Sequence, residues 1–269
     1  MNATSAQKPA WHMPAILVPN GQVTGSNKTT IIVVWSVIFL IWWSTYPPAI
    51  IPKPIDTLNA WLMLFTSGNL AVHIASSLEL NIYAIVASTV ISLVITYTSL
   101  LPIFRPIAKM VSYMRYMGLT GVSFVFTLLA SGLELKVMLL TFGMTVFFVT
   151  SMLAVVENIE ADDYRLARSL GMGPWQTMYE VVIRGTLHHA FDILRQNAAI
   201  GWLMLTAVEG LVRSGGGLGL VLLNENKAFH LEQIFALQIT VLTIALFQDY
   251  LFGWAYQAFF RYATLSRGR

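Results

Sequence analysis

The sequence predicts an all-α integral membrane protein, and three observations lead to this fold class. Hydrophobic residues make up 56% of the 269 residues and charged residues only 11%, whereas soluble domains carry about a quarter charged residues. Long uncharged segments recur at the length of about 20 residues that a helix needs to cross a bilayer. A single long polar segment, residues 157–195, interrupts them and is predicted to form a helix–turn–helix outside the bilayer.

The composition excludes several classes of function. The chain has no cysteine, which rules out disulfides, thiolate metal sites and cysteine nucleophiles. Adjacent helical residues such as His188 and His189 point about 100° apart, and no Asp or Glu stands at metalloprotease spacing, so no metal site is predicted. The Gly-x4-Gly-Lys-Ser/Thr motif is missing, so the chain is not expected to hold ATP phosphates itself. The net charge of +3 needs no nucleic acid, because basic cytoplasmic loops produce the same balance.

The chain divides into a membrane domain and two tails. Residues 1–28 are polar and are expected to form a flexible cytoplasmic tail, because their apolar run is too short for a signal peptide. The membrane domain covers residues 29–262, and residues 263–269 form a basic cytoplasmic tail. The first span is expected between Thr29 and Pro52. Three aromatic residues form an interfacial belt at its far end, Trp42, Trp43 and Tyr46.

About five further spans bring the predicted total to about six. Residues 51–79 break into one or two short helices, one of which is expected to lie on the membrane surface. The next four spans are expected between Glu79 and Arg105, between Arg115 and Glu134, between Lys136 and Glu157, and from Asn197 to Val208. A sixth covers residues 234–260, and residues 131–136 and 213–233 form loops. The second span is rich in Ser and Thr, which allow close contact between helices in a membrane.

The distribution of basic residues predicts the orientation. With both termini in the cytoplasm, the cytoplasmic segments hold 12 of the Lys and Arg residues and the external segments hold 4. This bias follows the positive-inside rule and places residues 157–195 in the cytoplasm.

In that position the polar segment resembles the cytoplasmic coupling loop of type I ATP-binding-cassette (ABC) importer permeases. The family pattern is Glu-Ala-Ala, three residues, Gly, nine residues, then Ile-x-Leu-Pro. Aligned on Gly171, Ala167 takes the third position of the pattern and Val181 and Ile183 take the hydrophobic pair. Gly171 suits a sharp turn between two helices because glycine adopts positive φ without penalty.

Further segments resemble the nitrate, sulfonate, taurine and bicarbonate branch of this family. The stretch ARSLGMGPWQTMYEVVI is similar to that branch's loop, and IPKPIDTLNAWLMLFTSGNLAVHIASSL is similar to the segment before its second span. AVEGLVRSGGGLG resembles the pattern near the end of its fifth span. The likeness covers about residues 51–262, which is most of the chain.

Two positions depart from the family pattern. Arg165 stands where the pattern has Glu, and Arg184 stands where it has Pro. The reversed charge at Arg165 leaves three interpretations open: an acidic partner surface, a second, non-identical permease that supplies the usual contact, or a subunit of unusual or weak activity.

The resemblance implies a non-catalytic permease subunit in a bacterial-type inner membrane. Its partners would be ABC ATPase subunits, which bind ATP and magnesium, a second permease copy or paralogue, and an extracytoplasmic substrate-binding protein. The solute would be a small oxyanion, a sulfonate, bicarbonate or a similar compound. The ATPase contact is expected at Glu160, Ala161, Asp162, Arg165, Ala167, Arg168, Leu170, Gly171, Met172 and Gly173.

Two acidic residues are candidates for the translocation path. Glu209 lies at the end of the fifth span, where it either serves function or extends to the outer interface. Asp249 lies deeper in the sixth span, where it either pairs within the bundle or contacts the solute. A secondary transporter that uses both as an ion relay is the alternative function, although no internal repeat supports it. A membrane enzyme would need clustered His, Asp or Ser residues, and the sequence scatters them.

Overall fold

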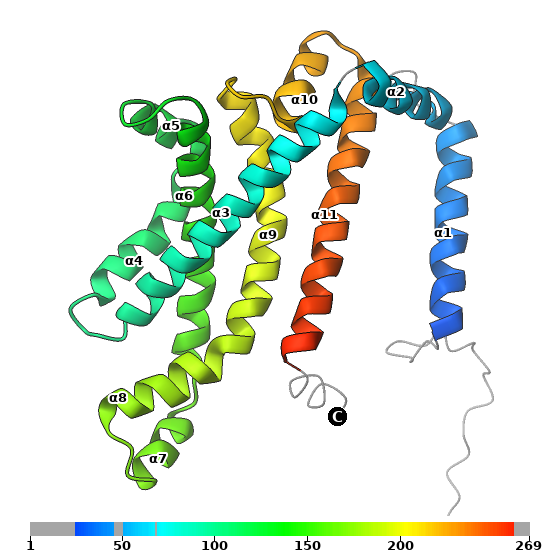
Figure 1. The fold of residues 1–269 in the computed structure, drawn as a ribbon. Helices are drawn as coiled ribbons and strands as arrows, with labels where there is room; N and C mark the ends of the chain where they lie inside the picture. Colours follow the sequence, from blue (N-terminus) through cyan, green and yellow to red (C-terminus); the bar gives the residue numbers. More distant parts are fainter. Residues whose placement is uncertain (1–24, 46–50, 68, 261–269) are drawn as a thin grey trace, which may run out of the picture. The chain divides into compact units, whose positions relative to one another are not determined.

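The computed structural model describes residues 25–45, 51–67 and 69–260, which form helices and turns without a strand (Figure 1). The predicted all-α fold class is confirmed. The contacts divide the chain into two units, Met1–Asp56 and Thr57–Arg269, and each is considered by itself. Residues 1–24 and 261–269, within or next to the two predicted tails, and Tyr46 of the predicted aromatic belt lie outside the described residues.

Four described helices are long and apolar enough to cross a membrane: α1 (Gly25–Thr45), from Asn27 on, α3 (Leu70–Thr98), α6 (Gly132–Glu157) and α11 (Leu231–Phe259). A fifth helix, α9 (Gly185–Leu211), is as long but more polar. Its length of 27 residues corresponds to about 40 Å, enough to cross a bilayer. Its polar residues Asn197 and Glu209 are buried in the bundle, so they do not face lipid.

The first unit contains α1. Its side chains are exposed almost throughout, as expected for a spanning helix that lipid surrounds. The Trp43 indole N–H donates a hydrogen bond of 3.0 Å to the Pro52 carbonyl, and the Phe39 ring contacts the Trp43 ring. The helix begins at Gly25, so the predicted tail boundary at residue 28 falls one turn too late.

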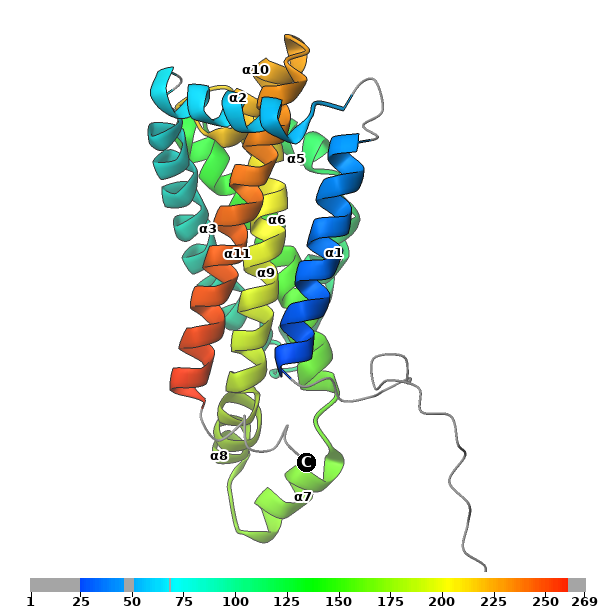
Figure 2. The same cartoon turned by 90° about the vertical axis from the view of Figure 1, so that its right-hand side faces the viewer.

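The second unit is built around the contact between α3 and α6. Small side chains recur on one face of α3 about every fourth residue and are buried there: Ala84, Ser88, Ser92 and Thr96. The Ser92 hydroxyl donates a hydrogen bond of 3.3 Å to the Thr145 carbonyl of α6, so the two backbones lie close together. The predicted role of small residues in the second span is therefore confirmed. Figure 2 shows α3, α6, α9 and α11 running along one another.

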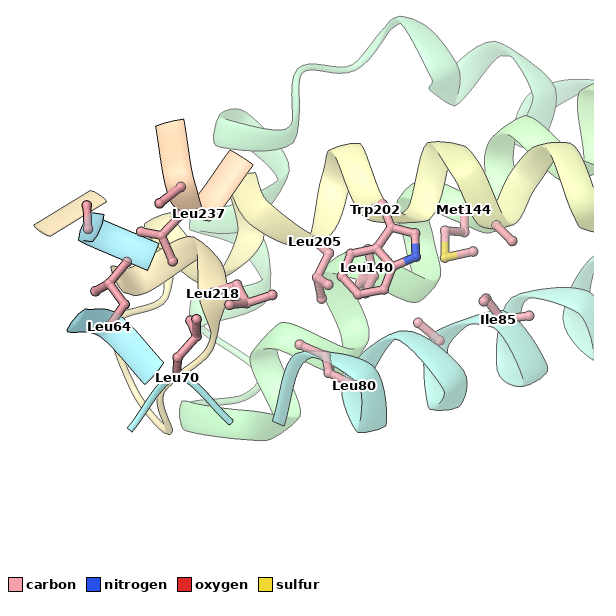
Figure 3. Close-up of a cluster of buried hydrophobic side chains, with 14 residues drawn as sticks. Leu64, Leu70, Leu80, Ile85, Leu140, Met144, Trp202, Leu205, Leu218 and Leu237 are labelled. Carbon is pink, nitrogen blue, oxygen red and sulfur yellow. The ribbon is translucent and has the colours of Figure 1, made fainter. Parts of the chain in front are cut away.

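A continuous apolar cluster joins six helices at one end of this bundle, as Figure 3 shows. It combines residues of α2 (Pro54–Ser67), α3, α6, α9, α10 (Leu218–Lys227) and α11, and its labelled members are Leu64, Leu70, Leu80, Ile85, Leu140, Met144, Trp202, Leu205, Leu218 and Leu237. From Thr57 on, α2 packs on the beginning of α11, where the Trp61 indole donates to the Thr240 hydroxyl at 3.0 Å. With 14 residues α2 is too short to span, as predicted.

The predicted third span, between Arg115 and Glu134, is not a single helix. The chain returns along α6 in three pieces: α4 (Arg105–Tyr113), η2 (Met114–Tyr116) and α5 (Leu119–Thr127). Ser112 of α4 bonds with Thr150 near the end of α6, and α5 packs near its beginning. Met117 and Gly118 have extended backbone and break the helix between η2 and α5.

Several other predicted boundaries are wrong. The second span starts at Leu70, so Glu79 lies inside α3, and Asn69 starts the helix with a left-handed φ of 49°. The residues 131–136 that were predicted as a loop belong mostly to α6, which starts at Gly132. Residues 218–227 of the predicted 213–233 loop form α10. The fifth span starts at Gly185, inside the predicted polar loop.

Candidate functional site

A sharp helical turn at the α7 end of the bundle is the first candidate site, and we call residues 160–177 the elbow. It consists of α7 (Ala161–Ser169), the turn at Gly171 and α8 (Pro174–Thr177). Asp162 and Asp163 lie in the first turn of α7, where carboxylates favour the positive end of the helix dipole.

The turn itself is a Schellman motif. Gly171 has a φ of +78° and donates to the Arg168 carbonyl at 3.0 Å, while Met172 donates to the Ala167 carbonyl at 3.1 Å. A residue other than glycine would strain this backbone, because positive φ brings a Cβ close to the peptide carbonyl. The sequence-based assignment of the turn to Gly171 is confirmed.

The second arm of the elbow continues into the bundle without a break. After α8 the chain forms a π-helix, η3 (Met178–Arg184), and then α9. Both figures show this stretch as one bent helical rod (Figures 1 and 2). Residues 185–195, predicted as the end of the polar loop, therefore belong to the spanning helix α9. Any displacement of the elbow would act directly on α9.

The elbow exposes large apolar side chains. Leu170 is 66% exposed and Trp175 67%, and Leu166 and Tyr179 are exposed beside them. Of the ten residues predicted for ATPase contact, eight are exposed, Met172 is half-buried, and Ala167 is buried. Arg165 pairs with Asp162 on the outside of α7, and Arg184 donates to Glu180 at 3.0 Å. These surface pairs leave the apolar residues uncovered.

A cavity of ≈ 720 Å³ lies between the elbow and the end of α3. It is lined by Leu100, Leu101, Tyr164, Arg168, Met172, Pro174, Trp175, Thr177, Met178 and Val182. Burial raises the pKa of the Tyr164 phenol, and the neighbouring Asp163 carboxylate raises this pKa further. Tyr164 is therefore neutral at physiological pH and adds no charge to the cavity.

The second candidate site surrounds Glu209, whose side chain is fully buried near the end of α9. The Ser77 hydroxyl of α3 donates to its carboxylate at 2.8 Å, and the Gly219 amide donates at 2.8 Å. The expected alternative, in which Glu209 extends to the outer interface, is wrong. The carboxylate accepts hydrogen bonds from Ser77 and Gly219 inside the bundle.

Two more side chains close the same network around the glycine-rich loop, residues 215–219. The His73 Nδ1 atom accepts from the Gly217 amide at 3.2 Å. The Lys136 ammonium, 1% exposed, donates to the Gly216 carbonyl at 2.7 Å. We call His73, Ser77, Lys136, Glu209 and this loop the glycine-loop clamp. It ties α3, α6 and α9 to the start of α10, and sequence reasoning found only Glu209 of its four side chains.

Asp249 forms an ion pair with Arg195. The Arg195 Nε and Nη2 atoms lie 2.5 and 2.6 Å from the two Asp249 carboxylate oxygens, and the side chains are 40% and 41% exposed. Asp249 was expected from the sequence either to pair within the bundle or to contact the solute, and the structure contains the pair. Arg195 was not among the predicted site residues, because it falls inside the segment assigned to the polar loop.

The adjacent histidines His188 and His189, which were considered in the sequence and set aside as metal ligands, can be placed in the structure. The His188 and His189 rings contact each other at a tilt of 39°, with centroids 3.9 Å apart. Within the described ranges, no group of three or more His, Asp or Glu side chains lies close enough together to hold a metal ion.

A comparison with protein families places the chain in a family. Residues 85–261 match the family of binding-protein-dependent transport system inner membrane components. The chain belongs to this family. The matched region runs from α3 to the end of α11, so it contains the elbow, Glu209 and the Arg195–Asp249 pair.

One curated relative refines the comparison. The taurine transport system permease protein TauC of Escherichia coli (strain K12) is 24% identical over 230 residues, which cover 79% of this chain and 81% of that protein. The predicted resemblance to type I ABC importer permeases is confirmed. The chain is therefore a multi-pass membrane protein of an inner-membrane permease family.

Proposed function

We propose that this chain is the transmembrane permease subunit of an ABC importer and that the elbow couples it to a separate ATPase subunit. The carrying observation is the continuity of the elbow with α9: its exposed apolar residues sit on a helical rod that enters the bundle without a break. Exposed Leu and Trp side chains on a rigid element are typical of a protein contact surface.

The proposed mechanism follows from the helix contacts. When two ATPase subunits close on ATP, they move the elbow, and η3 transmits this movement to α9. Helix α9 packs on α3, α6, α10 and α11, so its displacement changes the bundle as a unit. At the other end of α9, the glycine-loop clamp connects Glu209 to the start of α10, so α10 would move together with α9. Alternating access would result from this movement in a pair of permeases.

The proposed assembly contains further partners. A second permease, identical or a paralogue, would complete the translocation path, and an extracytoplasmic binding protein would deliver the solute. ATP and magnesium would bind to the ATPase, so this chain would hold no cofactor and catalyse no reaction. The bias of basic residues supports an orientation with the elbow and both termini in the cytoplasm.

The solute class is supported by likeness alone. TauC belongs to a taurine system, and taurine is a small sulfonate. We propose a small anion of the oxyanion, sulfonate or bicarbonate type. The alternative of an ion-coupled transporter is disfavoured by the geometry, because Glu209 is enclosed by donors and Asp249 is paired with Arg195.

The test is gentle purification from native membranes, followed by reconstitution. We expect an ABC ATPase to co-purify and uptake into vesicles to require ATP, the ATPase and the binding protein, with taurine as the first solute tried. Solute uptake that persists in vesicles lacking any ATPase would contradict the proposal and favour the ion-coupled transporter.

A further inference from the structure

The long helices of the second unit expose faces of different chemistry. On α3 the exposed residues are mostly apolar, and four of them form a ridge at intervals of four: Ile82, Val86, Val90 and Val94. On α11 the exposed residues include Leu242, Leu246, Phe247, Leu251 and Trp254. Lipid chains can surround such faces without cost, because no polar group loses its hydration.

The exposed face of α9 is different. Its exposed residues include His189, Gln196, Ala199, Leu203 and Ala207, and the half-buried Asp192 and Arg195 border the same face. The spacing of three and four residues places them along one side of the helix. Ionisable side chains in a membrane-spanning segment are costly toward lipid and instead face a bundle interior or water. This face therefore fits an aqueous path better than a lipid surface.

We propose that this face of α9 lines the solute path and that the Arg195 guanidinium contacts the anionic group of the solute; this rests on the proposed function above. Arg195 directs Nε and Nη2 to Asp249, while Nη1 donates no hydrogen bond to a described residue. Arginine nitrogens match the planar spacing of sulfonate and carboxylate oxygens. Asp249 keeps the side chain oriented, and the pair carries no net charge.

Two neighbours of Arg195, Gly253 and Asp192, define which solutes the site would accept. Gly253 of α11 lies beside the Arg195 guanidinium, where a Cβ would make an ordinary van der Waals contact, 3.5 Å from the Cζ and Nη1 atoms. Asp192 also interacts electrostatically with Arg195 from one turn away. Beside these two carboxylates, the guanidinium supplies the positive charge that an anionic solute would approach. The site would accept a small solute with one anionic group, and the two aspartates would repel a second carboxylate on the same solute.

The absence of native cysteine makes the path testable without knowing the solute. Single-cysteine variants Gln196→Cys and Ala199→Cys are compared with Val86→Cys on α3 and Leu246→Cys on α11, in membranes carrying the full transporter. The probes are 2-sulfonatoethyl and 2-(trimethylammonio)ethyl methanethiosulfonate, which carry opposite charges and react with thiolates in water. We expect both α9 variants to react at least about tenfold faster than the two controls.

The role of Arg195 is tested by the ratio of the two reaction rates in Ala199→Cys, one helical turn away. Arg195→Gln should lower the anion-to-cation ratio by about tenfold, because it removes one positive charge nearby. Arg195→Lys should keep the ratio within about threefold, since the charge remains. Asp249→Asn should raise the anion-to-cation ratio, because it removes a negative charge. The double variant Arg195→Gln/Asp249→Asn should return the ratio toward the parent value. The double variant leaves no unpaired charge at this ion pair, so it keeps the test possible if Arg195→Gln alone fails to fold.

The outcomes separate the two proposals. A ratio that Arg195→Gln or the paired variants leave unchanged, or an Ala199→Cys variant as slow as Val86→Cys, would overturn the path assignment. Neither result depends on ATP hydrolysis. A lack of ATP-driven uptake together with a charge-dependent ratio would instead overturn the importer assignment and leave an aqueous anion-selective face on α9.

Discussion

Ser77 on α3 donates a hydrogen bond to the carboxylate of Glu209 on α9, across 132 residues of sequence. The same hydroxyl accepts from the Leu218 amide at 2.8 Å, so one small side chain connects a spanning helix, a buried acid and the first turn of α10. Because Lys136 is buried in the same network, the clamp combines a basic and an acidic side chain within the bundle, and each has hydrogen-bond partners there.

The first prediction concerns the charge of Glu209. Glu209→Gln can keep one oxygen to accept from Ser77 and Gly219, but it replaces the other carboxylate oxygen, to which the Ser77 hydroxyl also donates, with an amide NH2 and removes the acidic group. The loss should be about 1–3 kcal/mol of stability, measured as a lowered thermal unfolding midpoint in detergent. Glu79→Gln on the exposed side of α3 is the control and should leave the midpoint unchanged. Equal midpoints for both variants would show that the clamp contributes nothing.

The second prediction concerns the close approach at Gly219. A Cβ there would overlap the Thr206 carbonyl and the Glu209 side chain, and the backbone atoms cannot move aside. Gly219→Ala should therefore destabilise the protein by about 1–3 kcal/mol or more. Gly121→Ala in α5 meets no atom within 4 Å and should be neutral or stabilising by up to about 1 kcal/mol. Comparing the unfolding midpoints of the two variants is the measurement, and a tolerated Gly219→Ala would contradict this packing.

The third prediction concerns the turn of the elbow. Gly171→Val must hold a β-branched residue at a φ of +78°, which costs about 1–2 kcal/mol and should open the turn. The variant should insert normally while ATP hydrolysis continues without solute uptake. Gly121→Val is the control, because Gly121 lies in α5, outside the elbow, has no positive φ, and a Cβ there would meet no atom within 4 Å. Unchanged uptake per ATP in Gly171→Val would show that the elbow is not the coupling element.

The fourth prediction separates surface stability from partner contact. Arg165 and Arg184 each belong to an exposed ion pair within one helical turn, and such pairs contribute about 1 kcal/mol or less. Arg165→Ala and Arg184→Ala should therefore unfold at nearly the parental temperature. If Arg165 contacts an acidic ATPase surface, only Arg165→Ala should weaken co-purification of the ATPase, and its difference from the parent protein should shrink at high salt, because salt screens the contact that the parent makes. Equal retention of the ATPase by both variants would point to one of the other two interpretations of Arg165.

Much of the fold was predictable because the bilayer imposes simple rules. Backbone groups must be satisfied within each spanning segment, so uncharged runs of sufficient length predict helices such as α3, α6 and α11. The turn at Gly171 was predictable for a similarly local reason, since its Gly-x-Gly-Pro pattern combines permissive backbone with a helix start. The features that depend on a few neighbouring residues, the spanning helices and the turn at Gly171, could therefore be predicted from the sequence.

The errors arose where tertiary contacts override local composition. Helix α9 extends from Gly185, although its first turns are polar, because it continues the rod of α8 and η3 and buries Ala190 and Ile193 against α6. The third crossing is divided into α4, η2 and α5 because Met117 and Gly118 adopt extended backbone, which no charge or proline signals. Arg195 was missed for the same reason: its partner Asp249 lies 54 residues away.

By itself, the sequence determined that this protein is helical, spans a membrane repeatedly and turns sharply at Gly171. These properties follow from hydropathy, from residue spacing within one helix and from the φ preference of glycine, all of which act over a few residues. The tertiary structure alone decided that Glu209 is enclosed by Ser77 and Gly219 and that Asp249 is paired with Arg195. The physical reason is that a buried charge depends on which donors other helices bring to it, and that is set by the packing of α3, α6, α9 and α11.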